Sequence, residues 1–201
     1  MASIYDLKPK FQTLLRPLVR TLAGAGVTAN QITVAALLLS CLAGSMIALN
    51  PQERWPLLLV PVVSFLRMAL NAIDGMLARE HDMKSPFGAI LNELGDVLSD
   101  IALYLPFSLI AGVSAGWVVI VVMLAVVSEL AGVIAVEIGA QRRYDGPMGK
   151  SDRAFVFGLI GLALGLGARP EPWVNFFLMI TVGLLVITVA NRARRALEEA
   201  K

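Results

Sequence analysis

Residues 116–139, GWVVIVVMLAVVSELAGVIAVEIG, form the apolar stretch that decides the class of fold. The only charged residues in it are Glu129 and Glu137. An α-helix needs about 20 predominantly apolar residues to cross a hydrocarbon core of about 30 Å. The sequence therefore predicts a membrane-spanning helix over these residues.

Five further apolar stretches, each bounded by glycine, proline or charge, accompany it in the chain: 32–49, 55–73, 88–111, 154–168 and 173–191. Of the 201 residues, 57% are hydrophobic and 16% are charged, against roughly 25% charged in a typical soluble domain. This balance excludes a disordered chain and argues against a water-soluble globule. We predict an all-α integral membrane protein with six transmembrane helices. The stretch 154–168 is short and glycine-rich, so we allow its helix to begin in the basic segment before it.

Residues 1–27 are predicted to form an amphipathic helix on the membrane surface, followed by a six-helix bundle over 28–201 in a single domain. Apolar side chains recur there at helical spacing, at Ile4, Leu7, Phe11, Leu14, Leu15, Leu18 and Leu22. Basic side chains lie elsewhere around the same helix, at Lys8, Lys10, Arg16 and Arg20. Thr28 and Asn30 are suitable caps for the first spanning helix.

The distribution of basic residues predicts the orientation. With six spans, fourteen basic residues lie on one side of the membrane: Lys8, Lys10, Arg16, Arg20, Arg79, Lys84, Arg142, Arg143, Lys150, Arg153, Arg192, Arg194, Arg195 and Lys201. The opposite loops hold only Arg54 and Arg169. Because cytoplasmic loops carry the excess of Lys and Arg, we expect both termini to be cytoplasmic and the protein to reside in the cell (inner) membrane.

Polar residues cluster in two neighbouring segments, 71–79 (NAIDGMLAR) and 88–100 (GAILNELGDVLSD). Their spacings of three and four put them on shared helix faces, and the short turn between the segments predicts antiparallel neighbouring helices. Oxygen ligands that converge without His or Cys suit a hard divalent cation, Mg²⁺ or Mn²⁺. The candidate ligands are Asn71, Asp74, Asn92, Glu93 and Asp96. The alternative is that these acids pair with Arg67 and Arg79 and only fix helix packing.

Four basic residues are expected on the same side of the membrane as these acids: Arg142, Arg143, Lys150 and Arg153. One interpretation is a pocket for the phosphate of an acceptor, such as a phosphorylated polyol. The other is an orientation signal that also attracts anionic lipid. For Glu129 the sequence leaves open whether it lines such a pocket or pairs with Arg67. Nothing in the distribution of basic and aromatic residues indicates nucleic-acid binding.

The polar cluster in segments 71–79 and 88–100 resembles the signature of the CDP-alcohol phosphotransferase family, D-x2-D-G-x2-A-R-x8-G-x3-D-x3-D. The spacing matches throughout, with Asn71 and Asn92 in place of two of the four aspartates. The matching residues are Asp74, Gly75, Ala78, Arg79, Gly88 and Asp96. Residues 28–33 (TANQIT) resemble the family's T-P-N-x-L-T, and residues 149–153 (GKSDR) resemble a basic element that members place near the acceptor. Six helices after a surface helix is also the family's layout.

The resemblance implies that a hydroxyl of an acceptor alcohol attacks a CDP-alcohol, commonly CDP-diacylglycerol, and releases CMP in phospholipid biosynthesis. It implies one or two divalent cations, with Asp74 as a ligand and Asp96 as general base or shared ligand. The CDP moiety would contact Asn30, Gly75, Ala78, Arg79 and Gly88. Lys150 and Arg153, together with Arg142 and Arg143, would contact the acceptor. The resemblance is also the ground for expecting a homodimer.

The two asparagines leave three versions of this enzyme open: two metal ions with altered affinity, one metal ion, or an inactive relative. A protein of another class would bind CDP-lipid or nucleotide without turnover. An ion or proton transporter is a third hypothesis. It is disfavoured because no relay of acids continues through the last two apolar stretches.

Overall fold

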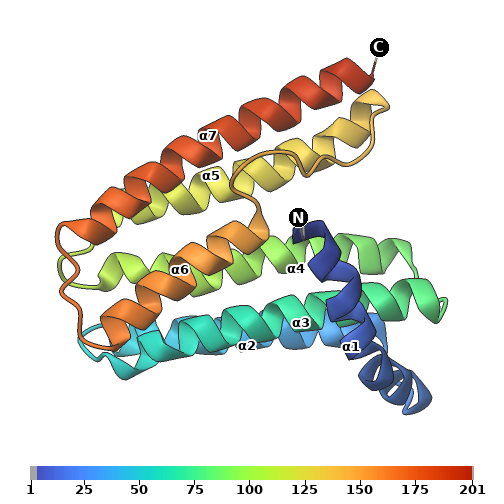
Figure 1. Ribbon diagram of the computed structural model, residues 1–201, viewed down its shortest axis with the longest axis horizontal. Helices are drawn as coiled ribbons and strands as arrows, with labels where there is room; N and C mark the ends of the chain where they lie inside the picture. The colour runs from blue at the N-terminus through green and yellow to red at the C-terminus, as the bar shows by residue number, and fades with distance from the viewer. Residues whose placement is uncertain (1–3, 201) are drawn as a thin grey trace.

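The computed structural model describes residues 4–200 and, for residues 4–10, the backbone only. This part of the chain is all-α, as predicted, and contains no strand (Figure 1). The helices are α1 (Ile4–Gly24), α2 (Ala29–Leu49), α3 (Leu59–Glu80), α4 (Pro86–Tyr104), α5 (Ala115–Ile134), α6 (Lys150–Gly165) and α7 (Trp173–Glu199). Short 3-10 helices are η1 (Trp55–Leu58), η2 (Leu105–Leu109) and η3 (Ala135–Ile138).

Within residues 4–200, four helical segments are long and apolar enough to cross a membrane: Ala29–Leu49, Trp55–Glu80, Ala115–Ile138 and Trp173–Glu199. Helix α4 carries three carboxylates, and α6 is only 16 residues long, so neither stands out by apolarity and length. The total of six spans therefore stays a prediction. Helix α6 begins at Lys150, inside the basic segment, and α7 continues well beyond the predicted end of its apolar stretch.

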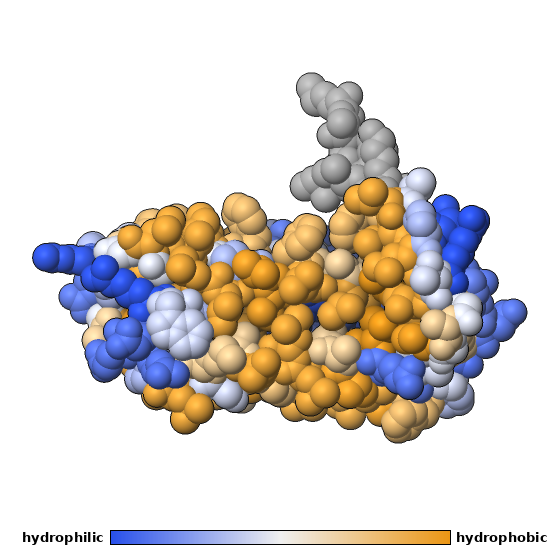
Figure 2. All heavy atoms as spheres, turned by 90° about the horizontal axis from the view of Figure 1, so that it is seen from below, coloured by the Kyte–Doolittle hydropathy of each residue, from blue (hydrophilic) through white to orange (hydrophobic). Residues whose placement is uncertain are grey.

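On the face shown in Figure 2, apolar side chains lie between two hydrophilic ends. Phe65 on α3, Leu94 on α4 and Phe155 on α6 are each more than half exposed. A surface of this kind is unfavourable in water and suits the hydrocarbon layer of a bilayer. The pattern supports membrane insertion for the bundle as a whole.

Helix α2 packs against both α3 and α4, α5 packs against α7, and α6 packs against α3. The expectation that α3 and α4 are direct neighbours needs correction: they run antiparallel, but each packs on α2 more closely than on the other (Figure 1). A short turn fixes the direction of two helices, whereas side-chain packing fixes their separation. Helix α6 packs against α3 and forms ion pairs with α4, so it links the two helices.

Helix α1 crosses α3 and packs against it (Figure 1). Arg16 on α1 forms an ion pair with Glu80 at 3.1 Å. The side chains of Ile4, Leu7, Lys8 and Lys10 in the predicted amphipathic pattern lie outside the described part, as does Lys201. Thr28 caps α2 in a reciprocal box with Gln31, which confirms Thr28 as a cap.

Candidate functional site

Asp74, on the C-terminal half of α3, lies at the centre of the candidate site. It is 6% exposed, and its Oδ2 accepts a hydrogen bond of 2.9 Å from Thr33 Oγ1 on α2. Cγ2 of the same Thr33 would lie 3.3 Å from a Cβ at Gly95, which precedes Asp96 on α4. The two halves of the signature are therefore brought together on α2.

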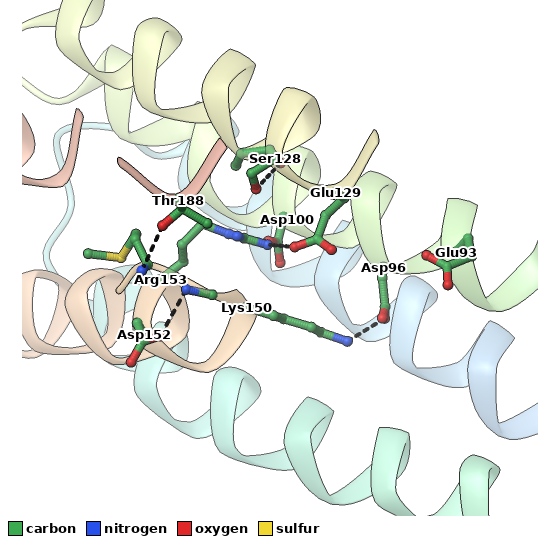
Figure 3. Close-up of polar contacts among 12 residues, drawn as sticks. Glu93, Asp96, Asp100, Ser128, Glu129, Lys150, Asp152, Arg153 and Thr188 are labelled. Atoms are coloured by element: carbon green, nitrogen blue, oxygen red, sulfur yellow. Dashed lines mark hydrogen bonds and ion pairs between the residues drawn. The ribbon is translucent and has the colours of Figure 1, made fainter. Parts of the chain in front are cut away.

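Lys150 reaches from the first turn of α6 to Asp96, and its Nζ donates a hydrogen bond to Asp96 Oδ1 (Figure 3). Both side chains are about one quarter exposed, so the pair faces accessible space. A cation from the chain thus already balances the carboxylate that the signature assigns to proton transfer. Oδ2 of Asp96 is the oxygen that this contact does not use.

Asn71 and Asn92 are partly buried, and within residues 4–200 their side chains make no hydrogen bond. No three of the His, Cys, Asp and Glu side chains described converge as a metal-binding group. The four signature positions supply two carboxylates and two uncharged amide oxygens. This donor set fits hard-cation chemistry, but with half the charge of four aspartates. Glu93, the fifth candidate ligand, is paired with Arg142 at 2.6 Å.

The glycine-containing part of the signature meets the start of α2. A Cβ at Gly88 would lie 2.7 Å from Oδ1 of Asn30, so a larger residue at this position would require the Asn30 side chain to shift. Ser85 caps α4 by accepting a hydrogen bond of 3.0 Å from the Gly88 N–H. Arg79, one turn after Gly75, is exposed and makes no ion pair with any described side chain.

A buried ion-pair network lies beside the site. Asp100 accepts hydrogen bonds from Arg67 at 2.9 Å and from Arg153 Nε at 3.0 Å. The alternative in which Arg67 pairs with the acids thus holds for Asp100. Arg79 does not form the other pair expected in that alternative.

Glu129 on α5 extends this network. It accepts hydrogen bonds from Arg153 at 2.9 Å and from Arg142 and Arg192 at 3.3 Å each, and Figure 3 shows it pointing toward Arg153. The sequence left open whether Glu129 lines a pocket or pairs with Arg67; its observed ion-pair partners are these three other arginines. Arg192 also donates to the carbonyl oxygen of Ser128.

The loop between η3 and α6 positions Arg142 and separates it from Arg143. Its backbone is attached to α5 by Arg143 N–H to Gly132 O at 3.1 Å and to α7 by Met148 N–H to Thr188 Oγ1 at 3.0 Å. Arg142 points toward Glu129, whereas Arg143 binds Asp145 and Glu199. The hydrogen bond from Arg143 lowers the pKa of Asp145 below its usual value.

Sequence reasoning did not assign Thr33, Asp100, Arg67 or Arg192 to the site. An available signal was the presence of ionisable residues inside or beside apolar stretches, which are costly there unless paired. The ion pairs join residues that are far apart in sequence. For that reason the spacing of residues along one helix does not identify them.

A family model for CDP-alcohol phosphatidyltransferase matches residues 26–193. The chain belongs to this family. Within the CDP-alcohol phosphatidyltransferase family it is similar to the inner membrane protein YnbA of Escherichia coli, with 48% identity over 97% of this chain and 96% of that protein. It is also 34% identical to the archaetidylinositol phosphate synthase of Pyrococcus horikoshii, over 47% of each chain.

The fold is similar to that of a protein of known structure. The phosphatidylinositol phosphate synthase PgsA1 of Mycobacterium tuberculosis, solved with CDP-DAG bound, superposes with a TM-score of 0.73. The match covers 92% of both chains at 19% identity. The same enzyme solved with manganese and citrate gives a TM-score of 0.72 over 90% of this chain and 88% of that one.

Proposed function

We propose that this family member is a membrane transferase that moves a phosphatidyl group from a CDP-alcohol, with CDP-diacylglycerol as the favoured donor, to an acceptor alcohol and releases CMP. One observation carries the proposal: Asp74 and the part of α4 that carries Asp96, from the two halves of the signature, both lie against Thr33 of α2, and the pair of Asp96 with Lys150 is about one quarter exposed. The CDP-DAG bound to the structurally similar PgsA1 supports the choice of donor.

The donor side of the site consists of Asn30, Gly75, Ala78, Arg79 and Gly88. Arg79 carries a charge that no described carboxylate pairs with, so it is available to the anionic diphosphate. An apolar groove of about 250 Å³ between α3 and α6, bordered by Pro61, Phe65 and Phe155, begins next to Ser151. A groove in this position suits an acyl chain whose headgroup lies beside Lys150 and Asp96.

In the proposed reaction the hydroxyl oxygen of the acceptor forms a bond to the phosphorus that bears the lipid. The bond from that phosphorus to the bridging oxygen breaks, and CMP leaves with the electron pair. The hydroxyl proton passes to Oδ2 of Asp96, while Lys150 orients this carboxylate through Oδ1. Arg79 stabilises negative charge on the diphosphate, and Arg142 and Arg153 contact the acceptor.

Asn71, Asp74, Asn92 and Asp96 would hold the divalent cation, Mg²⁺ or Mn²⁺, which neutralises charge on the diphosphate when bound. Two carboxylates and two amides favour one ion over two. Manganese in the related PgsA1 structure supports a metal of this class. Glu93 is left out of this set because of its contact with Arg142.

We further propose six spans, with α4 and α6 crossing among the four apolar ones, cytoplasmic termini, and α1 as an amphipathic helix on the inner-membrane surface. The polar pairs of α4 and α6 face each other inside the bundle, which lowers the cost of placing them in a membrane. We retain the single domain over 1–201 and the homodimer as proposals.

The test is release of CMP from labelled CDP-diacylglycerol by purified protein in detergent, with Mn²⁺ and a panel of acceptor alcohols. We expect Asp96→Asn to lower kcat by at least about 100-fold, the usual scale for loss of a general base. The matched control is Asp82→Asn, in the exposed turn between α3 and α4, where φ is 55° and asparagine is tolerated. Equal rates in the two variants would refute the proposal.

The alternative is a relative that binds CDP-lipid or nucleotide without turnover. Replacement of two signature carboxylates by Asn71 and Asn92 favours it, because the site has lost two of the charges that hold metal. Saturable binding of CMP with no release from the donor, for every acceptor tried, would establish this alternative.

A further inference from the structure

Three arginine side chains surround the carboxylate of Glu129 in an arrangement that resembles an anion-binding site. Arg153 comes from α6, Arg142 from the preceding loop and Arg192 from α7, and all three donate to the same carboxylate. Arg153 and Arg192 are each 1% exposed. Convergent guanidinium groups are the usual receptor for a phosphate or carboxylate, and here a side chain of the protein already fills it.

The candidate acceptor-binding cations are also paired with other carboxylates. Lys150 binds Asp96, and Arg142 and Arg153 have Glu93 and Asp100 as second partners. A phosphorylated acceptor would therefore meet a carboxylate beside every cation it approached. Displacing Glu129 would leave a largely buried carboxylate without its partners, which is unfavourable.

The arginines nevertheless keep hydrogen-bond donors. Nε and Nη1 of Arg142 and Nη1 of Arg153 are buried and have no partner among the described residues. Because the charge of these guanidinium groups is compensated while their N–H groups are free, they suit a neutral oxygen, such as that of a hydroxyl group. The donor side differs, since Arg79 has both its charge and its N–H groups available.

We propose that the acceptor is an uncharged, unphosphorylated polyhydroxy alcohol, and that Glu129 excludes the phosphorylated form of that alcohol. This inference rests on the proposed transferase function and names its acceptor class. Glu129 determines specificity without touching the reacting atoms.

The first test compares acceptors with the wild-type protein, CDP-diacylglycerol and Mn²⁺. Glycerol is paired with glycerol phosphate, and inositol with inositol phosphate, and CMP release is measured for each. We expect kcat/KM for the uncharged member of the active pair to be higher by at least about tenfold. A preference for either phosphorylated acceptor overturns the proposal, whereas absence of CMP release with all four bears on the transferase function alone.

The second test needs no turnover. Thermal unfolding of the detergent-solubilised protein is followed with and without inorganic phosphate, with CMP added to fill the donor side. We expect phosphate to raise the Tm of Glu129→Gln and to leave wild type unchanged. The matched control is Glu198→Gln, which removes an exposed carboxylate from Arg194 and Arg195. A rise in the wild-type Tm on addition of phosphate refutes the inference, and this result decides even if Glu129→Gln fails to fold.

Discussion

Asp100→Asn removes the charge at the centre of the buried network. Asp100 is 5% exposed and lies 2.9 Å from a nitrogen of Arg67 and 2.9 Å from a nitrogen of Arg153. At an effective dielectric constant of about 20, each contact is worth about 6 kcal/mol before desolvation is subtracted. Removing one partner of a buried pair costs about 3–5 kcal/mol, because the other charge is left without compensation.

We expect a loss near the lower end of that range, about 3 kcal/mol, because Arg153 keeps Glu129 while Arg67 loses its carboxylate partner. This corresponds to roughly a 100-fold shift in the unfolding equilibrium. The free energy of unfolding is measured by titrating SDS into mixed micelles and following tryptophan fluorescence.

Glu198→Gln serves as control, since an exposed pair contributes at most about 1 kcal/mol. The double variant Arg67→Met with Asp100→Asn should be more stable than the sum of the two single losses predicts, because it leaves no uncompensated Arg67 charge. A loss below about 1 kcal/mol for Asp100→Asn would show that burial of these charges does not control stability, and the reasoning would be wrong.

Two further predictions concern the cation site. Lys150→Met should tighten Mn²⁺ binding by about tenfold, because Asp96 loses the ammonium group that competes with the metal. Electron paramagnetic resonance of free Mn²⁺ measures the change in affinity. An unaltered affinity contradicts this prediction. Asn71→Asp combined with Asn92→Asp adds two carboxylates and should also tighten binding by at least about tenfold; if the same titration shows no change, these side chains are not ligands.

The helical membrane architecture was predictable because long apolar runs have few alternatives to a helix in a bilayer. The spacing of Asp74, Gly88 and Asp96 was equally informative, since it depends on local helix geometry and a short turn. The same local reasoning failed for the packing of α3 against α4. A loop restricts direction, but the extended contact of α2 with both helices sets their distance.

The acceptor side shows the limit of sequence most clearly. Lys150 and Arg153 were identifiable as candidates from their place before an apolar helix, but their partners were not. Asp96, Asp100 and Glu129 each lie more than 20 residues away in sequence and are joined to these cations only by helix packing.

The sequence by itself determined that the chain is helical and apolar, and it determined where the signature oxygens lie along two helices, because both follow from periodicity within single segments. Only the tertiary structure decided which charges are free and which are compensated. Compensation depends on distances between α4, α5, α6 and α7, and at these separations a shift of a few ångströms changes a binding site for an anion into a neutral pair.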